Sequence, residues 1–210
     1  MRIPLSGPDI TEQDILAVTD VLRSTRLSLG PKLEEFETAM AEYVGATHAV
    51  GVSSGTSGLH LCLRALGIGE GDEVMVPSFT FIAVANAVRY ERAIPVFVDI
   101  EPQRLNLDPA QIEAAITPRT KAIIAVHTFG CPANMGKILT IARKHHLFVI
   151  EDACEALGAE YGGRRVGALG DAGVFGFYPN KQITTGEGGM VVTQNKKNRC
   201  DGESSAKSGA

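Results

Sequence analysis

The chain has 210 residues, of which 44% are hydrophobic and 21% charged, and its formal net charge is -4. This is the composition of an ordinary globular protein, and one domain is the default expectation for this length. The small acidic charge and the lack of a Lys/Arg run interleaved with aromatic residues argue against nucleic acid as a partner. Because the sequence has no signal-peptide pattern and no apolar run long enough to span a bilayer, we expect a cytoplasmic protein with no membrane partner.

Short apolar runs alternate with amphipathic segments of helix length. Helices are expected at residues 10–23, 32–43, 57–66, 82–90, 109–115 and 135–146. Strands are expected at residues 48–53, 73–77, 95–99, 121–127, 147–151, 172–177 and 189–193. Several strands are unbroken apolar runs, which is typical of strands buried on both faces. The pattern predicts an α/β fold, with a mainly parallel sheet and helices on both faces.

Two further features bound the organisation of the chain. Residues 194–210 carry almost no large apolar side chain, so we expect an ordered domain over residues 1–193 and a polar, disordered tail after it. The four cysteines are widely spaced without a C-x-x-C pair, and the five histidines form no ligand set. No metal site is therefore expected.

The segment SSGTSG, residues 53–58, follows an expected strand and begins an expected helix. Free backbone N–H groups and small side chains at a helix N-terminus can hold a phosphate group. The segment has neither the lysine of a Walker loop nor a G-x-G-x-x-G fingerprint. The same residues also suit an ordinary helix cap, with Ser54 or Thr56 as the capping residue.

Two more positions can carry chemistry. Asp152 ends the apolar strand LFVIED, and a carboxylate there can keep a pyridine nitrogen protonated or can simply cap the next turn. Lys181 lies in the Gly/Thr-rich segment FYPNKQITTGEGG between two strands, where partial burial favours Schiff-base chemistry, although most lysines are solvated surface charges. The ordered combination of phosphate cup, strand-end Asp and loop Lys is more specific than any one member.

Together with PVFVDIEP and VHTFGCPANM, these segments resemble the DegT-type sugar aminotransferases, which are fold-type-I enzymes dependent on pyridoxal 5'-phosphate (PLP). The resemblance covers almost the whole expected domain, and FYPNKQITTGEGG is especially similar to perosamine-synthase-like members. It implies the large domain of the aspartate-aminotransferase-like fold, with PLP as cofactor.

The resemblance also implies roles for individual residues. Lys181 is the expected catalytic residue, which forms the internal aldimine with PLP, and Asp152 pairs with the pyridine nitrogen. Glu155 lies where the family usually has a Gln or His near the cofactor's phenolic oxygen. A glutamate must be protonated to donate a hydrogen bond there.

The remaining expected cofactor contacts lie near the phosphate and the ring. Thr56 and Ser57 hold the phosphate through amides and hydroxyls, and Phe81 stacks on the ring. Gly176 stands where many relatives place a serine that contacts the phosphate. The relatives also continue into a C-terminal domain that contributes to the site, partly from a neighbouring subunit, so the resemblance implies a truncated large domain and a homodimer.

For the full-length relative, the resemblance implies transfer of an amino group from glutamate to a nucleotide-linked keto-deoxy sugar. Lys181 would move the proton between the substrate and the cofactor. Dehydratase-type relatives carry histidine at the position of Lys181, so a PLP-dependent sugar dehydratase is a less favoured function than an aminotransferase. The alternatives are an inactive remnant that binds PLP weakly or merely dimerises, and a Rossmann-type dinucleotide module, which has only the α/β pattern in its favour.

Overall fold

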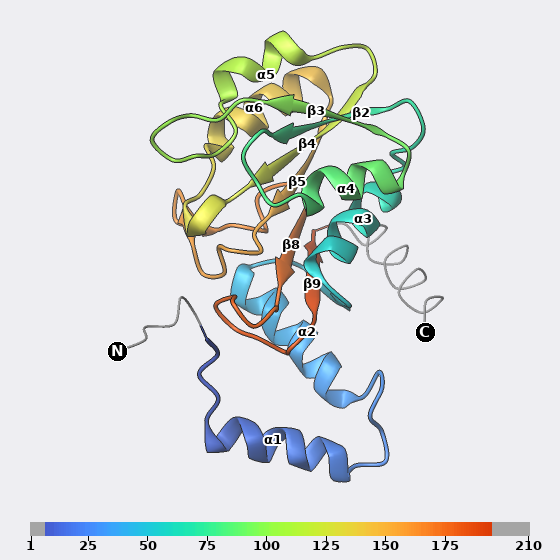
Figure 1. Cartoon of the computed structure of the whole chain (residues 1–210), viewed down its shortest axis with the longest axis vertical. Coiled ribbons are helices and arrows are strands. Elements are labelled where there is room, and N and C mark those ends of the chain that lie inside the picture. The colour runs from blue at the N-terminus through green and yellow to red at the C-terminus, as the bar shows by residue number, and fades with distance from the viewer. Residues whose placement is uncertain (1–6, 195–210) are drawn as a thin grey trace.

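The computed structural model describes residues 7–194, and an open sheet with helices on both faces forms its body (Figure 1). The helices are α1 (Glu12–Arg23), α2 (Pro31–Val44), α3 (Gly55–Ala65), α4 (Ala83–Tyr90), α5 (Pro109–Ala115) and α6 (Met135–His145). The strands are β1 (His48–Val52), β2 (Glu73–Pro77), β3 (Ile94–Val98), β4 (Thr120–Val126), β5 (Phe148–Asp152), β6 (Glu160–Tyr161), β7 (Arg164–Arg165), β8 (Ala172–Gly176) and β9 (Gly189–Thr193). A short 3-10 turn, η1 (Thr128–Gly130), follows β4.

The main sheet has seven strands in the order β1-β9-β8-β5-β4-β2-β3. Strands β3, β2, β4, β5 and β8 run parallel to one another, whereas β9 is antiparallel to both β8 and β1. Helices α4, α5 and α6 lie in the connections β2–β3, β3–β4 and β4–β5, whereas the connection from β5 to β8 holds the β6–β7 hairpin. The mainly parallel sheet predicted from the sequence is therefore confirmed.

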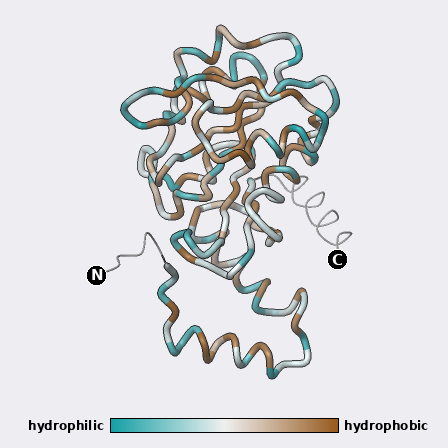
Figure 2. Tube along the Cα trace, viewed as in Figure 1, coloured by the Kyte–Doolittle hydropathy of each residue, from teal (hydrophilic) through white to brown (hydrophobic). Residues whose placement is uncertain are grey.

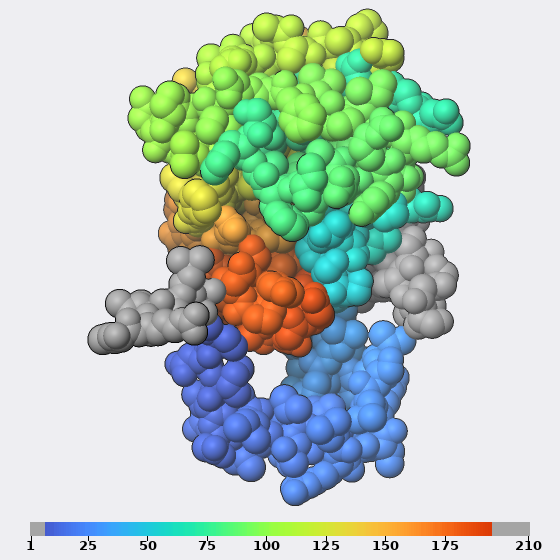
Figure 3. Space-filling view, in the orientation of Figure 1, coloured from blue at the N-terminus to red at the C-terminus, as the bar shows by residue number. Residues whose placement is uncertain are grey.

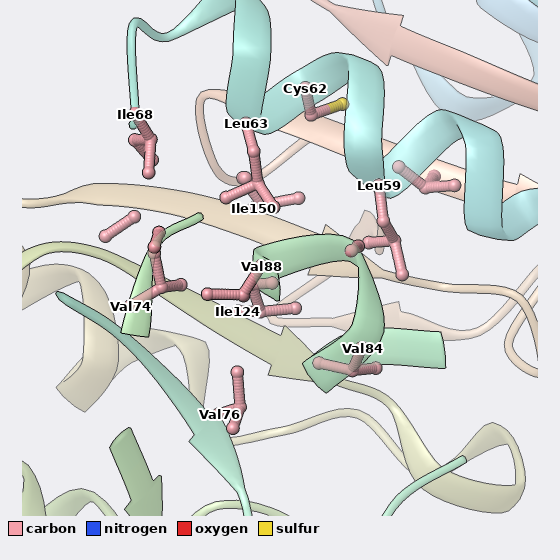
Figure 4. Packing of buried hydrophobic residues seen from close by; sticks show 14 of the residues in the cluster. Leu59, Cys62, Leu63, Ile68, Val74, Val76, Val84, Val88, Ile124 and Ile150 are labelled. Carbon is pink, nitrogen blue, oxygen red and sulfur yellow. The ribbon is translucent and has the colours of Figure 1, made fainter. Parts of the chain in front are cut away.

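The apolar core has a layer on each face of this sheet. On one face, α3 and α4 cover alternate residues of the central strands, and Leu63, Val88 and Ile124 lie in this layer with no exposed surface (Figure 4). On the other face, α5 and α6 cover the intervening residues, among them Ile123 and Val149. The alternation follows from the two-residue period of a strand, which sends successive side chains to opposite faces.

A third group of buried apolar residues lies at the β1 end of the sheet. Helix α2 packs there on β1, β8 and β9 through Met40 and Val44. Helix α1 differs, because none of its residues is buried. Its apolar residues Leu16, Val18 and Leu22 are each at least 60% exposed. Figures 1 and 2 show α1 as an arm, with apolar positions along it, set apart from the sheet.

Each helix and strand expected from the sequence is present within a few residues of its expected ends. The β6–β7 hairpin was not expected, although Gly162 and Gly163, both with positive φ, mark its turn. Gln194, which the sequence placed in the polar tail, is hydrogen-bonded through its side chain to Thr47 and Gly45, and residues 195–210 lie outside the described residues. In the part of the chain that the structure describes, no helix combines the length and apolar character needed to cross a membrane.

Candidate active site

The carboxyl ends of β4, β5 and β8 lie next to one another at one edge of the sheet. Val126 pairs with Asp152, and Asp152 pairs with Val174, so the segments that follow these three strands start side by side. Crevices at this edge are where open α/β sheets bind ligands. Asp152, Glu155 and Lys181 all belong to this edge or to the segments that leave it.

Lys181 lies in the segment between β8 and β9, where its backbone N–H donates to the Tyr178 carbonyl over 2.9 Å. Its Nζ is 3.2 Å from Oε1 of Glu155, in the turn that follows β5. The Lys181 side chain is 19% exposed and that of Glu155 is 41% exposed. The amine is therefore largely sheltered and ion-paired, in contrast to an ordinary surface lysine.

Asp152 is the last residue of β5 and is buried. Its Oδ1 accepts the Cys154 backbone N–H at 3.1 Å, so the turn-capping role that the sequence left open is present. Burial raises the pKa of this carboxyl above its usual range, and the hydrogen bond from Cys154 and the nearby positive charge of Lys181 oppose that rise only in part. A cationic partner would therefore stabilise the ionised form of this buried carboxyl group.

Thr56 and Ser57 lie in the first turn of α3, which begins at Gly55, two residues before its expected start. The N-cap is Ser54, whose hydroxyl accepts the Ser57 N–H at 3.1 Å. The Ser57 hydroxyl is also within 2.7 Å of the Ser54 hydroxyl and 2.8 Å of the Ser53 hydroxyl. The cap therefore exists, and it leaves a cluster of small hydroxyl groups beside the first backbone N–H groups of the helix, which have no acceptors within the helix.

The start of α3 approaches the Asp152 side of the sheet closely because Gly55 has no side chain. A Cβ at Gly55 would lie 2.6 Å from the Cys154 Sγ and 3.5 Å from the Gly176 Cα. A Cβ at Gly176 would lie 3.3 Å from the same sulfur. Cys154 thus fills the space next to Gly176, the position at which many relatives have a serine. The hydroxyl cluster of α3 is adjacent to the turn that begins at Asp152.

Aromatic side chains surround this edge. Phe81, just before α4, is 76% exposed, and Phe129, in η1, is 72% exposed. The rings of Phe79 and Phe129 meet edge to face with centroids 6.2 Å apart. The Phe81 ring is therefore open to solvent. Sequence reasoning missed Phe129, whose only signal was an aromatic residue three positions after the end of β4.

A buried polar pair supports the same edge and was also missed. Glu151 and His127 have fully buried side chains, and His127 Nε2 lies 3.0 Å from Glu151 Oε2. The Ala133 N–H donates to His127 Nδ1, so Nε2 carries the proton and donates to Glu151. Glu151 points to the face opposite Asp152, as neighbours on a strand must, and it anchors the segment before β8.

A cavity of about 1130 Å³ lies between the α1 arm and the body, where Figure 3 shows an opening. Ser53 and Ser57 border it, so it reaches the hydroxyl cluster, whereas Asp152 and Lys181 do not line it. The sheltered amine of Lys181 and the buried carboxyl group of Asp152 lie outside this cavity, at the carboxyl edge of the sheet. Within residues 7–194, no cluster of three or more His, Cys, Asp or Glu side chains is suited to a metal ion.

The chain is similar to known proteins over nearly its whole length. The model of the "DegT/DnrJ/EryC1/StrS aminotransferase family" matches residues 8–201. GDP-perosamine synthase of Caulobacter vibrioides is 51% identical over 193 residues, which are 91% of this chain and 52% of that protein. The chain spans about half the length of the curated relatives it matches.

Two solved structures agree with this result. An aminotransferase from Psychrobacter cryohalolentis superimposes with a TM-score of 0.92 at 40% identity, over 95% of this chain and 52% of its own. The PLP form of Spr1654, a sugar aminotransferase homologue from Streptococcus pneumoniae, superimposes with a TM-score of 0.92 at 33% identity, over 99% of this chain and 56% of its own.

Proposed function

Because the chain belongs to the DegT/DnrJ/EryC1/StrS aminotransferase family, a family of PLP enzymes, we propose that its carboxyl-edge residues hold PLP and that it is the cofactor-binding part of a sugar-nucleotide aminotransferase. The observation that carries the proposal is the sheltered amine of Lys181, 3.2 Å from Glu155 and beside the buried Asp152. Bound there, PLP supplies an electron sink and a carrier for an amino group.

The residues present fit the chemical groups of this cofactor. A phosphate suits the first turn of α3, where the N–H groups and the hydroxyls of Thr56 and Ser57 lie together. A protonated ring nitrogen suits Asp152, because the positive charge offsets the desolvation that raises the pKa of that carboxyl. An aldehyde suits the amine of Lys181.

The side chains would divide the work in this arrangement. Lys181 would hold the cofactor and, when its Nζ is free, would move a proton at the reacting atom. Asp152 would keep the ring nitrogen protonated through its negative charge. Phe81, which is exposed, would cover one face of the ring. Glu155 lies against Lys181 and would therefore stand near the reacting end of the cofactor.

The proposed substrates are glutamate, as amino donor, and a nucleotide-linked keto-deoxy sugar, as acceptor. The name of the GDP-perosamine synthase relative supports an amino sugar attached to a nucleotide as the product. A second copy of the chain is the proposed partner, and the cytoplasm, where sugar nucleotides are available, is the proposed location. Because the relatives are about twice as long, we expect residues 1–210 alone to turn over slowly or to act as an inactive, weakly PLP-binding remnant.

The test compares this chain with a version extended by the second half of a relative. Both are incubated with PLP, glutamate and a keto-sugar nucleotide, and 2-oxoglutarate is measured. We expect turnover by the extended chain, loss of turnover on Lys181→Ala, and normal turnover on Lys137→Ala, a control at an exposed position of α6. An extended chain that is active without Lys181, or that makes no 2-oxoglutarate, contradicts the proposal.

A further inference from the structure

The carboxylate of Glu155 joins two segments that leave different strands. Its Oε1 lies 3.2 Å from Lys181 Nζ, in the segment after β8, and its Oε2 accepts the Phe129 N–H at 3.1 Å, in the turn after β4. The Glu155 carbonyl oxygen also accepts a hydrogen bond from the Gln182 side chain. One residue of the β5 turn therefore contacts both flanking segments of the site.

The backbone at Phe129 needs such a contact. Phe129 has a φ of 53° and ψ of 30°, the left-handed region that a bulky residue rarely occupies. Strained conformations of this kind persist only when the surrounding structure holds them. The next residue, Gly130, also has a positive φ, and a Cβ there would lie 3.3 Å from the Glu155 carbonyl oxygen. Glu155 thus supports this strained turn through its side chain, and its carbonyl oxygen lies close to Gly130.

We propose that Glu155 is the positioning residue of Lys181: in the cofactor-free chain its carboxylate holds the amine as an ammonium ion and ties it to the Phe129 turn. The held ammonium is unreactive as a nucleophile, so Lys181 waits in place without reacting with other electrophiles. The importance of this role for catalysis rests on the proposed function, but the contact itself does not.

A carboxylate suits this bridge better than an amide. Both partners, the Lys181 ammonium and the Phe129 N–H, are hydrogen-bond donors, and a carboxylate accepts on each of its two oxygens. A glutamine has one accepting oxygen and one donating NH2 group. Glu155→Gln therefore keeps the size of the side chain but loses the negative charge and leaves one of the two donors facing another donor.

The experiment measures the reactivity of Lys181 in the 210-residue chain without cofactor. The chain is treated with a limiting amount of acetic anhydride, and acetylation of Lys181 is compared by peptide mass spectrometry with that of Lys137, an exposed internal reference. Because Glu155 is partly exposed, we expect a modest gain, about three- to fivefold, in the Lys181/Lys137 ratio of Glu155→Gln. Glu160→Gln, a change at a 55% exposed carboxylate paired with Arg165, should leave the ratio unchanged.

A second arm uses the unaltered chain, so it does not depend on how the variant folds. Raising the salt concentration from about 0.05 to about 1 M shortens the screening length and weakens a partly exposed ion pair. The Lys181/Lys137 ratio should then rise, which a purely structural role of Glu155 does not predict. In Glu155→Gln the ratio should respond less to salt than in the unaltered chain, because only the interaction of Lys181 with Asp152 is left. Hydrogen exchange of the Phe129 N–H should be faster than in the unaltered chain.

An unchanged ratio in Glu155→Gln, or a ratio in the unaltered chain that ignores salt, overturns the proposal. These outcomes are separate from those of the proposed function, because no cofactor or substrate is present. If the ratio rises as expected but Lys181 does not take up PLP, the positioning role of Glu155 stands and the proposed function falls.

Discussion

Glu151 offers a sharp test of how the candidate site is supported. Its buried carboxylate accepts four hydrogen bonds, with Oε1 receiving the N–H groups of Leu169 and Gly170 at 2.7 and 2.8 Å. Its Oε2 receives the Gly167 N–H at 2.9 Å and His127 Nε2 at 3.0 Å. The segment before β8 is therefore held on the back of the strand that ends at Asp152.

The substitution Glu151→Gln keeps the shape and removes half of these acceptors. The amide oxygen can serve one pair of donors, and the amide NH2 must then face the other pair. Each buried donor left without an acceptor costs about 1–3 kcal/mol, so the two together cost about 2–6 kcal/mol. That is a large share of the roughly 5–15 kcal/mol that stabilises a folded domain.

The assay is urea unfolding followed by circular dichroism, with Glu35→Gln as the matched control. Glu35 forms an ion pair with Lys32 at 2.6 Å, but both side chains are at least 60% exposed. Such surface pairs contribute about 0–1 kcal/mol, so the control should stay near the unaltered chain. If Glu151→Gln is destabilised by no more than Glu35→Gln, the account of Glu151 as an obligatory acceptor is wrong.

Three further predictions concern the residues around the site. Burial raises the pKa of Asp152, so its carboxyl group stabilises the cofactor-free chain at a pH below its ordinary pKa, and that contribution is lost as the pH rises through the raised pKa. Asp152→Asn should therefore make the cofactor-free chain more stable at neutral pH by about 1–3 kcal/mol, as measured by thermal unfolding. A less stable variant contradicts this reading. Gly173→Ala places a Cβ 2.0 Å from the backbone oxygen of Gly167 and should lower the free energy of unfolding by about 2–3 kcal/mol or more. In the control Gly69→Ala the new Cβ has no atom within 4 Å, so the free energy of unfolding in urea should change little. Equal effects of the two substitutions refute the steric argument. Ser57→Ala should weaken PLP binding about tenfold in an absorbance titration, since one hydrogen bond to a charged group is lost, and unchanged affinity removes Ser57 from the phosphate site.

The sequence predicted the elements of the fold well because burial leaves a clear pattern. The run AIIAV in β4 is apolar throughout, since alternate residues face the two layers of helices, and such a run is readable without a structure. The direction of β9 was not predictable in the same way. No helix separates it from β8, so its antiparallel pairing depends on how the Lys181 segment turns back.

The sequence pointed to candidate site residues but not to their geometry. Asp152 and Lys181 were singled out because a strand-end carboxylate and a loop lysine occur in order after the SSGTSG segment, and the family resemblance implied their roles. The contact between Lys181 and Glu155 depends on β5 and β8 being neighbours, which the order of elements in the sequence does not reveal. The role of Glu151 was missed because its acceptors are filled by backbone N–H groups, which any sequence could provide.

The central claim is that Lys181 is the residue that takes up the cofactor. The most direct measurement incubates the chain, alone and extended by the second half of a relative, with PLP, reduces the mixture with borohydride and maps the modified peptide by mass spectrometry. The account predicts a stable pyridoxyl label on Lys181 and its loss in Lys181→Ala. A label on another lysine, or no label on the extended chain, would contradict it.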